Sequence, residues 1–262
     1  PAARRSLALA GGQKQPLTPV ERDRIRVIFV IFAFVVMFWA AFEQGGGLLN
    51  LFANEYTDRA VGSFTVPTGW FQSLNPLFIV LLAPVFSMLW SRLGERGRNP
   101  ATPVKMYAGL FLVAIGFLFL VVAVFEMQRT ADMKAGMLWL VLGYLFHTMG
   151  ELCISPVGLS VVTKLAPLRL GSLMMGVWFL INFVANTMAG YVGAFSEDMG
   201  RYEWMLALAA SAGVRPEHAG LLGVFGGIAV VLLMFTALLW AISGRIVGWM
   251  HGAEGPQGRP EP

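Results

Sequence analysis

Six apolar segments of this chain are each long enough to cross a lipid bilayer. They cover residues 27–53, 69–90, 104–125, 136–165, 170–195 and 221–250. A membrane-spanning helix needs about 20 predominantly apolar residues, and it satisfies its own backbone polar groups in a medium without water. The sequence therefore predicts an all-α membrane protein with six transmembrane helices. The first and fourth segments are long enough to imply tilt or extension beyond the bilayer.

The composition favours a membrane protein over a soluble one. Of the 262 residues, 56% are hydrophobic and 13% are charged, whereas soluble domains carry about 25% charged residues. The net charge of +4 does not indicate a nucleic-acid partner, because the basic residues lie at the ends of apolar segments without interleaved aromatic residues. The single cysteine, Cys153, excludes an internal disulfide.

Basic residues predict the orientation and the domain limits. Most Lys and Arg lie before the first segment, after the second and fourth, and near the end of the chain, and such loops are expected on the cytoplasmic side. Both termini are therefore predicted to be cytoplasmic. We expect a linker over residues 1–26, a transmembrane bundle over 27–250 and a disordered tail over 251–262. Because the chain lacks an initial Met and a signal-peptide pattern, we expect it to start inside a longer protein.

Two glutamates, Glu43 and Glu151, lie inside the apolar segments. A carboxylate in the middle of the bilayer costs about 3 kcal/mol, so such an acid marks a candidate functional site. Lys and Arg are confined to loops and helix ends, so a cationic partner is expected on a substrate or on another helical bundle. For Glu43 the alternative is a structural ion pair.

Each acid belongs to a polar stripe on its helix. Trp39 and Glu43 are four residues apart and share one helix face, which would continue through Gly46 or Gly47 to Asn50. The glycines at 45–47 either allow close contact between helices or loosen the helix.

His147 and Ser155 flank Glu151 on one helix face. Pro156 cannot donate a backbone hydrogen bond, so we expect a bend one turn past the acid. That bend is either a gating hinge or a simple irregularity in the helix.

Two further segments carry amides and a tryptophan. Asn75 precedes Pro76 in the second segment, while Trp178, Asn182 and Asn186 recur at four-residue spacing in the fifth. Trp178 is expected either in a cavity or as an anchor at the membrane interface.

Several motifs resemble those of one transporter family. They are FWAAFEQ at 38–44, QSLNP at 72–76, GELCISPVGLS at 150–160 with TKLAP at 163–167, and MMGVWFL at 174–180. In this order they resemble the seventh, eighth, tenth and eleventh transmembrane helices of the proton-coupled oligopeptide transporters, a branch of the major facilitator superfamily. The resemblance covers all of the chain except its tails. It implies two six-helix bundles around a central cavity, of which this chain supplies the C-terminal one.

The resemblance also implies roles for the two acids. Glu43 resembles the acid that pairs with a lysine of the first bundle and takes part in proton coupling. Glu151 resembles the acid that receives the amino terminus of a peptide, with Asn75 beside it. Both acids are thus candidates for proton coupling and for substrate binding.

Further candidates follow from the same resemblance. Trp39 and Trp178 look like walls of side-chain pockets, and Ser155 and Asn182 are secondary cavity contacts. The loop at 92–98 resembles the cytoplasmic motif that braces the inward gate. The gating candidates are Arg92, Arg96, Arg98 and Pro156.

The expected function is proton-coupled symport of di- and tripeptides by alternating access, in a plasma membrane that for a bacterium is the inner one. The expected partners are short peptides, protons, the bilayer and an N-terminal six-helix bundle that the chain lacks. No cofactor or metal is expected.

Three alternatives stay open. A carrier of this fold can take nitrate, an amino acid or a drug, and a membrane scaffold needs no cargo. An intramembrane metal enzyme would use His147 and Glu151, but the other histidines, His218 and His251, fall in a loop and in the tail, so a third ligand is hard to find.

Overall fold

The computed structural model describes residues 16–253, apart from the side chains at 159, 168, 196 and 197. Within this range six helical segments are long and apolar enough to cross a membrane: Pro19–Glu55, Gly69–Glu95, Thr102–Met127, Met137–Leu165, Gly171–Phe195 and Pro216–Trp249. The predicted six-helix membrane fold is thereby confirmed. Residues 1–15 of the expected linker and 254–262 of the expected tail lie outside the described residues.

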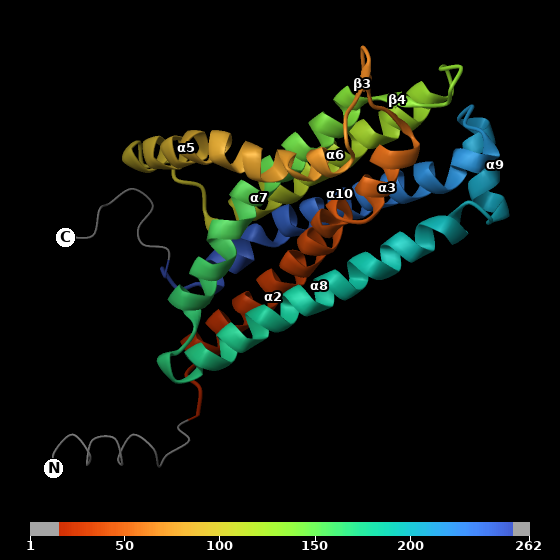
Figure 1. The fold of residues 1–262 in the computed structure, drawn as a ribbon. Coiled ribbons are helices and arrows are strands. Elements are labelled where there is room, and N and C mark those ends of the chain that lie inside the picture. Colours follow the sequence, from red (N-terminus) through yellow and green to blue (C-terminus); the bar gives the residue numbers. More distant parts are fainter. Residues whose placement is uncertain (1–15, 254–262) are drawn as a thin grey trace.

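The long helices are α2 (Pro19–Phe42), α5 (Leu74–Glu95), α6 (Thr102–Met127), α7 (Met137–Leu165), α8 (Gly171–Met199) and α10 (Ala219–Trp249). Short helices join them: η1 (Glu43–Gly45), α3 (Leu48–Glu55), α4 (Gly69–Gln72), η2 (Leu168–Leu170), α9 (Glu203–Ser211) and η3 (Pro216–His218). Two small strand pairs complete the described fold. β1 (Thr57–Asp58) pairs in parallel with β4 (Ala135–Gly136), and β2 (Ala60–Val61) pairs antiparallel with β3 (Phe64–Thr65). The strands and α9 lie at the end of the bundle away from the α7–α8 connection (Figure 1).

Helix α2 begins at Pro19, eight residues before the predicted start of the first apolar segment. Thr18 caps it: the Glu21 backbone N–H donates to the Thr18 hydroxyl at 3.2 Å, and the Thr18 N–H donates to the Glu21 carboxylate at 2.8 Å. This reciprocal capping box, with proline at the first helical position, favours helix initiation strongly. Residues 19–26 of the expected linker are therefore helical.

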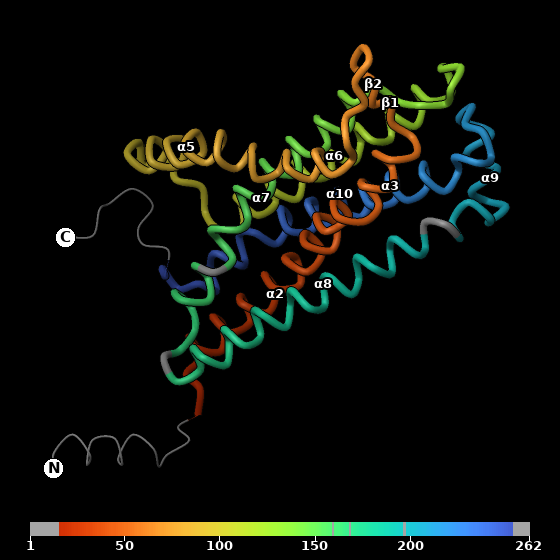
Figure 2. Tube along the Cα trace, in the orientation of Figure 1, coloured from red at the N-terminus to blue at the C-terminus, as the bar shows by residue number. Residues whose placement is uncertain are grey.

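The first membrane segment is broken beside Glu43. Helix α2 ends at Phe42, the 3₁₀ turn η1 starts at Glu43, and α3 resumes at Leu48 (Figure 2). The predicted continuous face from Trp39 to Asn50 is wrong beyond Glu43. The cause is the run of three glycines, since glycine is about 1 kcal/mol less favourable than alanine in a helix, and Gly47 leaves the helical region with φ −106° and ψ −89°.

The second membrane segment is also broken near its start. The short helix α4 ends at Gln72, and α5 begins two residues later at Leu74. Pro76 consequently stands in the first turn of α5, where its missing N–H has no partner to lose. Asn75 projects from that same first turn.

The core lies among α2, α3, α6 and α10, and its largest fully buried side chains include Phe38, Phe52, Phe117 and Phe225. In contrast, no residue of α5 is buried, and Phe179 and Phe183 of α8 are each 68% exposed. Helices α5 and α8 lie on opposite sides of the bundle (Figure 1). Apolar surface of this extent is covered either by lipid or by another part of a larger protein.

Helices α6 and α7 approach each other closely through glycines. A Cβ at Gly109 of α6 would lie 2.8 Å from the Gly150 carbonyl oxygen, and one at Gly150 would lie 2.7 Å from the Gly109 carbonyl oxygen. One heptad away, a Cβ at Gly116 would lie 2.5 Å from Cδ2 of His147. We call this contact line the glycine seam. In a membrane, helices associate through such close backbone contact because lipid supplies no hydrophobic drive between them.

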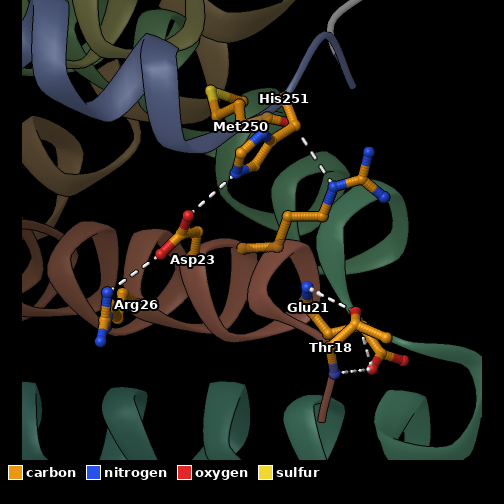
Figure 3. A network of polar contacts seen from close by, with 7 residues as sticks. Thr18, Glu21, Asp23, Arg26, Met250 and His251 are labelled. Carbon is orange, nitrogen blue, oxygen red and sulfur yellow. Dashed lines mark hydrogen bonds and ion pairs between the residues drawn. The ribbon is translucent and has the colours of Figure 1, made fainter.

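Polar contacts tie the start of α2 to the end of α10 (Figure 3). His251 Nε2 lies 2.9 Å from Asp23 Oδ2, and Arg24 Nε donates to the Met250 carbonyl oxygen at 3.4 Å. At the same level, Arg169 of η2 pairs with Glu21 at 3.0 Å. Such exposed pairs contribute at most about 1 kcal/mol each. They show that both ends of the described chain lie on one side of the bundle.

The glycine seam predicts an asymmetry among glycine substitutions. Gly109→Ala should destabilise the purified protein by about 1–3 kcal/mol, because the added methyl group meets backbone atoms of α7 that cannot move aside. Gly227→Ala in α10 is the matched control, since a Cβ there meets nothing within 4 Å in the described residues. Thermal unfolding in detergent should show a lower midpoint for Gly109→Ala only, and equal midpoints would contradict the seam.

Candidate functional site

Asn75 and Glu151, which are on different segments, form a direct hydrogen bond. Asn75 Nδ2 donates to Glu151 Oε2 at 2.8 Å and to Thr148 Oγ1 at 3.1 Å. The Thr148 hydroxyl donates in turn to the Tyr144 carbonyl oxygen at 2.8 Å. A hydrogen bond to an ionised acceptor is about twice as strong as a neutral one, so Asn75 stabilises the Glu151 carboxylate where lipid would not.

Glu43 borders two cavities. The smaller, about 130 Å³, is large enough for water and is lined by Phe42, Glu43, Gly45, Gly46, Gln72, Asn75, Tyr144 and His147. The larger, about 410 Å³, lies between the broken first helix and α8 and is lined in part by Gln44, Asn186, Gly190 and Gly193. The carboxylate of Glu43 therefore stands between the Asn75–Glu151 pair on one side and α8 on the other.

Two side chains hold the broken backbone next to Glu43. Gln44 Nε2 donates to the carbonyl oxygens of Ala40 at 3.0 Å and Ala189 at 3.1 Å. The Tyr144 hydroxyl donates to the Gly45 carbonyl oxygen at 3.0 Å. Irregular backbone at membrane depth is tolerated where neighbouring groups satisfy the freed polar atoms. Tyr144 does this from α7, whereas Gln44, within η1, satisfies the Ala40 carbonyl oxygen and ties the break to α8.

Neither acid has a cationic partner in the part of the chain that the structure describes. The ion pairs in that part involve residues at helix ends and connections instead. That a cation comes from a substrate or from another helical bundle stays a prediction.

The two predicted tryptophans pack against aromatic residues. The Trp39 ring lies edge-on to Phe38 and Phe42, with centroids 5.3 Å and 5.2 Å apart, and its indole N–H has no partner among the described residues. The Trp178 ring contacts Phe32 of α2 with centroids 5.9 Å apart.

The remaining predicted residues of α7 and α8 are exposed or form a hydrogen bond within their own helix. Ser155 and Pro156 are exposed, and α7 is continuous across Pro156. Asn182 is half-buried, and its amide donates to the Trp178 carbonyl oxygen at 3.1 Å. This bond within α8 occupies one of the two Asn182 donors.

Three residues of the site, Gln44, Tyr144 and Thr148, were not predicted from the sequence. A fourth, His147, was predicted only as a neighbour of Glu151. Tyr144 and Thr148 were detectable as positions seven and three residues before Glu151 on the same helix face, and Gln44 adjoins Glu43. His147 is 2% exposed, packs on Phe117 with centroids 4.6 Å apart, and has no partner for Nε2 in the described part. A polar layer thus surrounds the acids.

The predicted gating arginines lie away from the acids, at the end of α5. The Gly97 N–H donates to the Gly94 carbonyl oxygen at 2.9 Å, and the Arg98 N–H donates to that of Leu93 at 2.8 Å. With Gly97 at φ +66°, this is a Schellman motif, which needs glycine at that position. Arg92, Arg96 and Arg98 are exposed around it.

The fold and the site define an integral membrane protein with two acids inside its membrane-spanning segments. Comparison with known proteins shows its family. Residues 14–205 match the family model described as PTR2, POT family. Because this match covers most of the chain, the protein belongs to the POT family. The family resemblance drawn from the motifs is thereby confirmed.

Curated relatives agree with this assignment. The chain is 43% identical over 173 residues to the peptide transporter YePEPT of Yersinia enterocolitica, covering 66% of this chain and 34% of that protein. It is 31% identical over 246 residues to the dipeptide and tripeptide permease B of Aeromonas hydrophila, covering 92% of this chain and 46% of that protein. The chain thus spans between a third and a half of these relatives.

Solved structures show the same architecture. A crystal structure of the peptide transporter POT in complex with sulfate matches with a TM-score of 0.75 and 34% identity, over 90% of this chain and 43% of that one. A POT family transporter in complex with a thioalcohol-conjugated peptide matches with a TM-score of 0.74 and 27% identity, over 89% of this chain and 44% of that one.

The Tyr144 hydroxyl gives a direct test of how the break is held. Tyr144→Phe should cost about 1 kcal/mol, because it leaves the Gly45 carbonyl oxygen without this donor. Hydrogen exchange should become faster in the peptide that covers residues 43–47, with little change elsewhere. Tyr191→Phe is the control, since Tyr191 is 74% exposed. Unchanged exchange at 43–47 would show that the hydroxyl does not hold the break.

Proposed function

We propose that this chain is the C-terminal six-helix bundle of a proton-coupled symporter for di- and tripeptides. The observation that carries the proposal concerns the two acids: Glu43 lines a cavity that Asn75 also lines, and Glu151 accepts a hydrogen bond from Asn75. Neither acid has a cationic partner among the described residues. Uncompensated acids inside a membrane are typical of proton and substrate pathways. The names of the relatives, peptide transporter and dipeptide and tripeptide permease, support the cargo.

The whole transporter would consist of two bundles of the major facilitator type. This chain matches less than half of each relative's length, and α5 and α8 carry extensive exposed apolar surface. An N-terminal six-helix bundle would cover part of that surface and supply the cations that the acids lack. Substrate would bind between the bundles near the membrane midplane.

In this proposal the two acids have separate roles. Glu151, held by Asn75, receives the amino terminus of the peptide, while Trp39, Ser155, Trp178 and Asn182 contribute to the surrounding pocket. Glu43 pairs with a cation of the first bundle until a proton neutralises it. Loss of that pairing shifts the equilibrium between the inward-open and outward-open states.

Gating would involve the cytoplasmic end of the bundle. Exposed Arg92, Arg96 and Arg98 surround a rigid helix end that suits a brace against the other bundle. Pro156 is the candidate hinge within α7. The distribution of Lys and Arg supports cytoplasmic termini, and the bacterial relatives support the inner membrane.

The alternatives have less support. Family membership favours transport over a scaffold or an enzyme. For the metal-enzyme hypothesis, no group of three or more His, Cys, Asp or Glu in the described residues is placed to hold an ion. Carriage of nitrate, an amino acid or a drug is tested by competition, because unlabelled dipeptide should block uptake only if it shares the site.

Glu43→Gln should abolish uphill transport but spare binding. In liposomes holding the intact transporter, acid-driven accumulation of labelled dipeptide should fall at least about 10-fold, because a neutral amide cannot release its cationic partner on protonation. Exchange of dipeptide across equal pH should continue. Glu55→Gln, at the exposed end of α3, is the control. Undiminished accumulation in Glu43→Gln would remove Glu43 from the coupling role.

Glu151→Gln should weaken binding of dipeptides with a free amine by about 10- to 100-fold, the range for losing a charge-assisted hydrogen bond. An N-acetylated dipeptide lacks that ammonium group, so its weak binding should not fall further. Competition assays on the intact transporter measure both. Glu203→Gln, at the start of α9, is the control. Equal loss for both ligands would argue against contact between Glu151 and the amine.

A further inference from the structure

Gly158 of α7 and Trp178 of α8 fit together so closely that no larger residue could replace the glycine without movement. A Cβ at Gly158 would lie 2.3 Å from Cη2, 2.8 Å from Cζ3 and 3.4 Å from Cζ2 of the Trp178 indole. Carbon atoms in contact are about 3.5–4.0 Å apart. An alanine at 158 would therefore displace the benzene edge of the indole by more than about 1 Å.

The indole also contacts a residue of the core. Phe32 of α2 contacts it, with ring centroids 5.9 Å apart and planes inclined at 54°. Phe32 is 3% exposed and belongs to the core, so its side chain cannot easily shift to make room for the indole. Trp178 itself is only half-buried. An indole pushed off α7 would consequently move toward the open surface of the bundle rather than into its core.

The position along α7 connects this contact with the acid. Gly158 follows Glu151 by seven residues, or two helical turns, so both lie on one face about 10 Å apart along the axis. A dipeptide in extended form spans about 7 Å. The side chain of its second residue extends beyond this length, so a peptide with its amine at Glu151 can bring that side chain toward the Trp178 indole.

We propose that Gly158 is a positioning residue that fixes the Trp178 indole against α7, and so sets how large a substrate side chain is accepted next to Glu151. The proposal deepens the proposed function and rests on it. Because Gly158 has no Cβ, the indole packs directly against α7 and the pocket stays wide. Any side chain at 158 moves the indole outward and narrows the pocket.

The test compares small and bulky dipeptides in the intact transporter. Gly158→Ala should weaken competition by alanyl-phenylalanine at least about 10-fold, a discrimination of the size that a few displaced methylene groups give. Competition by dialanine should change less than about 2-fold. Gly176→Ala, at a position of α8 where a Cβ meets nothing within 4 Å in the described residues, is the control.

A second substitution separates positioning from mere damage to the fold. Trp178→Leu leaves room beside residue 158, so in that background Gly158→Ala should no longer change the preference between the two dipeptides. The same cycle is measured by thermal unfolding, where Trp178→Leu should also remove the destabilisation caused by Gly158→Ala. The proposal would be overturned if Gly158→Ala weakened competition by both dipeptides equally. It would also be overturned if Gly158→Ala still changed the preference between them in the Trp178→Leu background.

The two readouts keep this proposal apart from the proposed function. If the unsubstituted transporter ignores both dipeptides, the proposed cargo fails, and the selectivity role falls with it. If dipeptides compete normally and only unfolding shows coupling between 158 and 178, the contact is structural. In that case the selectivity role is wrong while the proposed function stands.

Discussion

The close contact between α6 and α7 is the constraint on which the rest of the site depends. Because Gly109 and Gly150 lack side chains, the backbones of α6 and α7 approach so closely that a methyl group would not fit between them. Gly116 likewise leaves room for the ring of His147. Such contact multiplies dispersion interactions that are individually small. Glu151 directly follows Gly150, so the seam fixes the depth and direction of the acid. Tyr144 and Thr148 then project from a helix that is already held in place.

Two broken helices complete the site around this fixed one. The breaks at Glu43–Gly47 and at Ser73 release backbone polar groups that hydrocarbon cannot satisfy. Tyr144 of α7 and Gln44 of η1 satisfy carbonyl oxygens at the first break. Asn75, next to the second break, donates to Glu151. Glu151 is thereby held by an uncharged donor, and the backbone next to Glu43 is held by Tyr144 and Gln44. A proton or a cationic group can stabilise such an acid, because a carboxylate is costly in hydrocarbon.

The sequence predicts the six spans and the acids within them because apolar length and four-residue spacing are local signals. It does not predict the break at Glu43, since three glycines are equally consistent with close contact between helices. The Tyr144–Gly45 hydrogen bond joins residues 99 positions apart, and no local pattern specifies it. The start of α2 is a different case. Thr18, Pro19 and Glu21 together carry a capping signal, which the interpretation of residues 1–26 as a linker overlooked.

Helix α7 changes partners along its length, from α6 next to Glu151 to α8 at Gly158. Its glycine contacts with α6 extend as far as Ile154, whereas Gly158, four residues later, receives the indole of Trp178 from α8. Pro156 lies between the two contacts. A helix is most easily bent where a hydrogen bond is missing. Bending at Pro156 would therefore leave Glu151 fixed on α6 while moving Gly158 and Trp178 relative to it. On the proposed function, the distance between the acid that binds the amine and the indole that contacts the side chain would then change as the bundle opens.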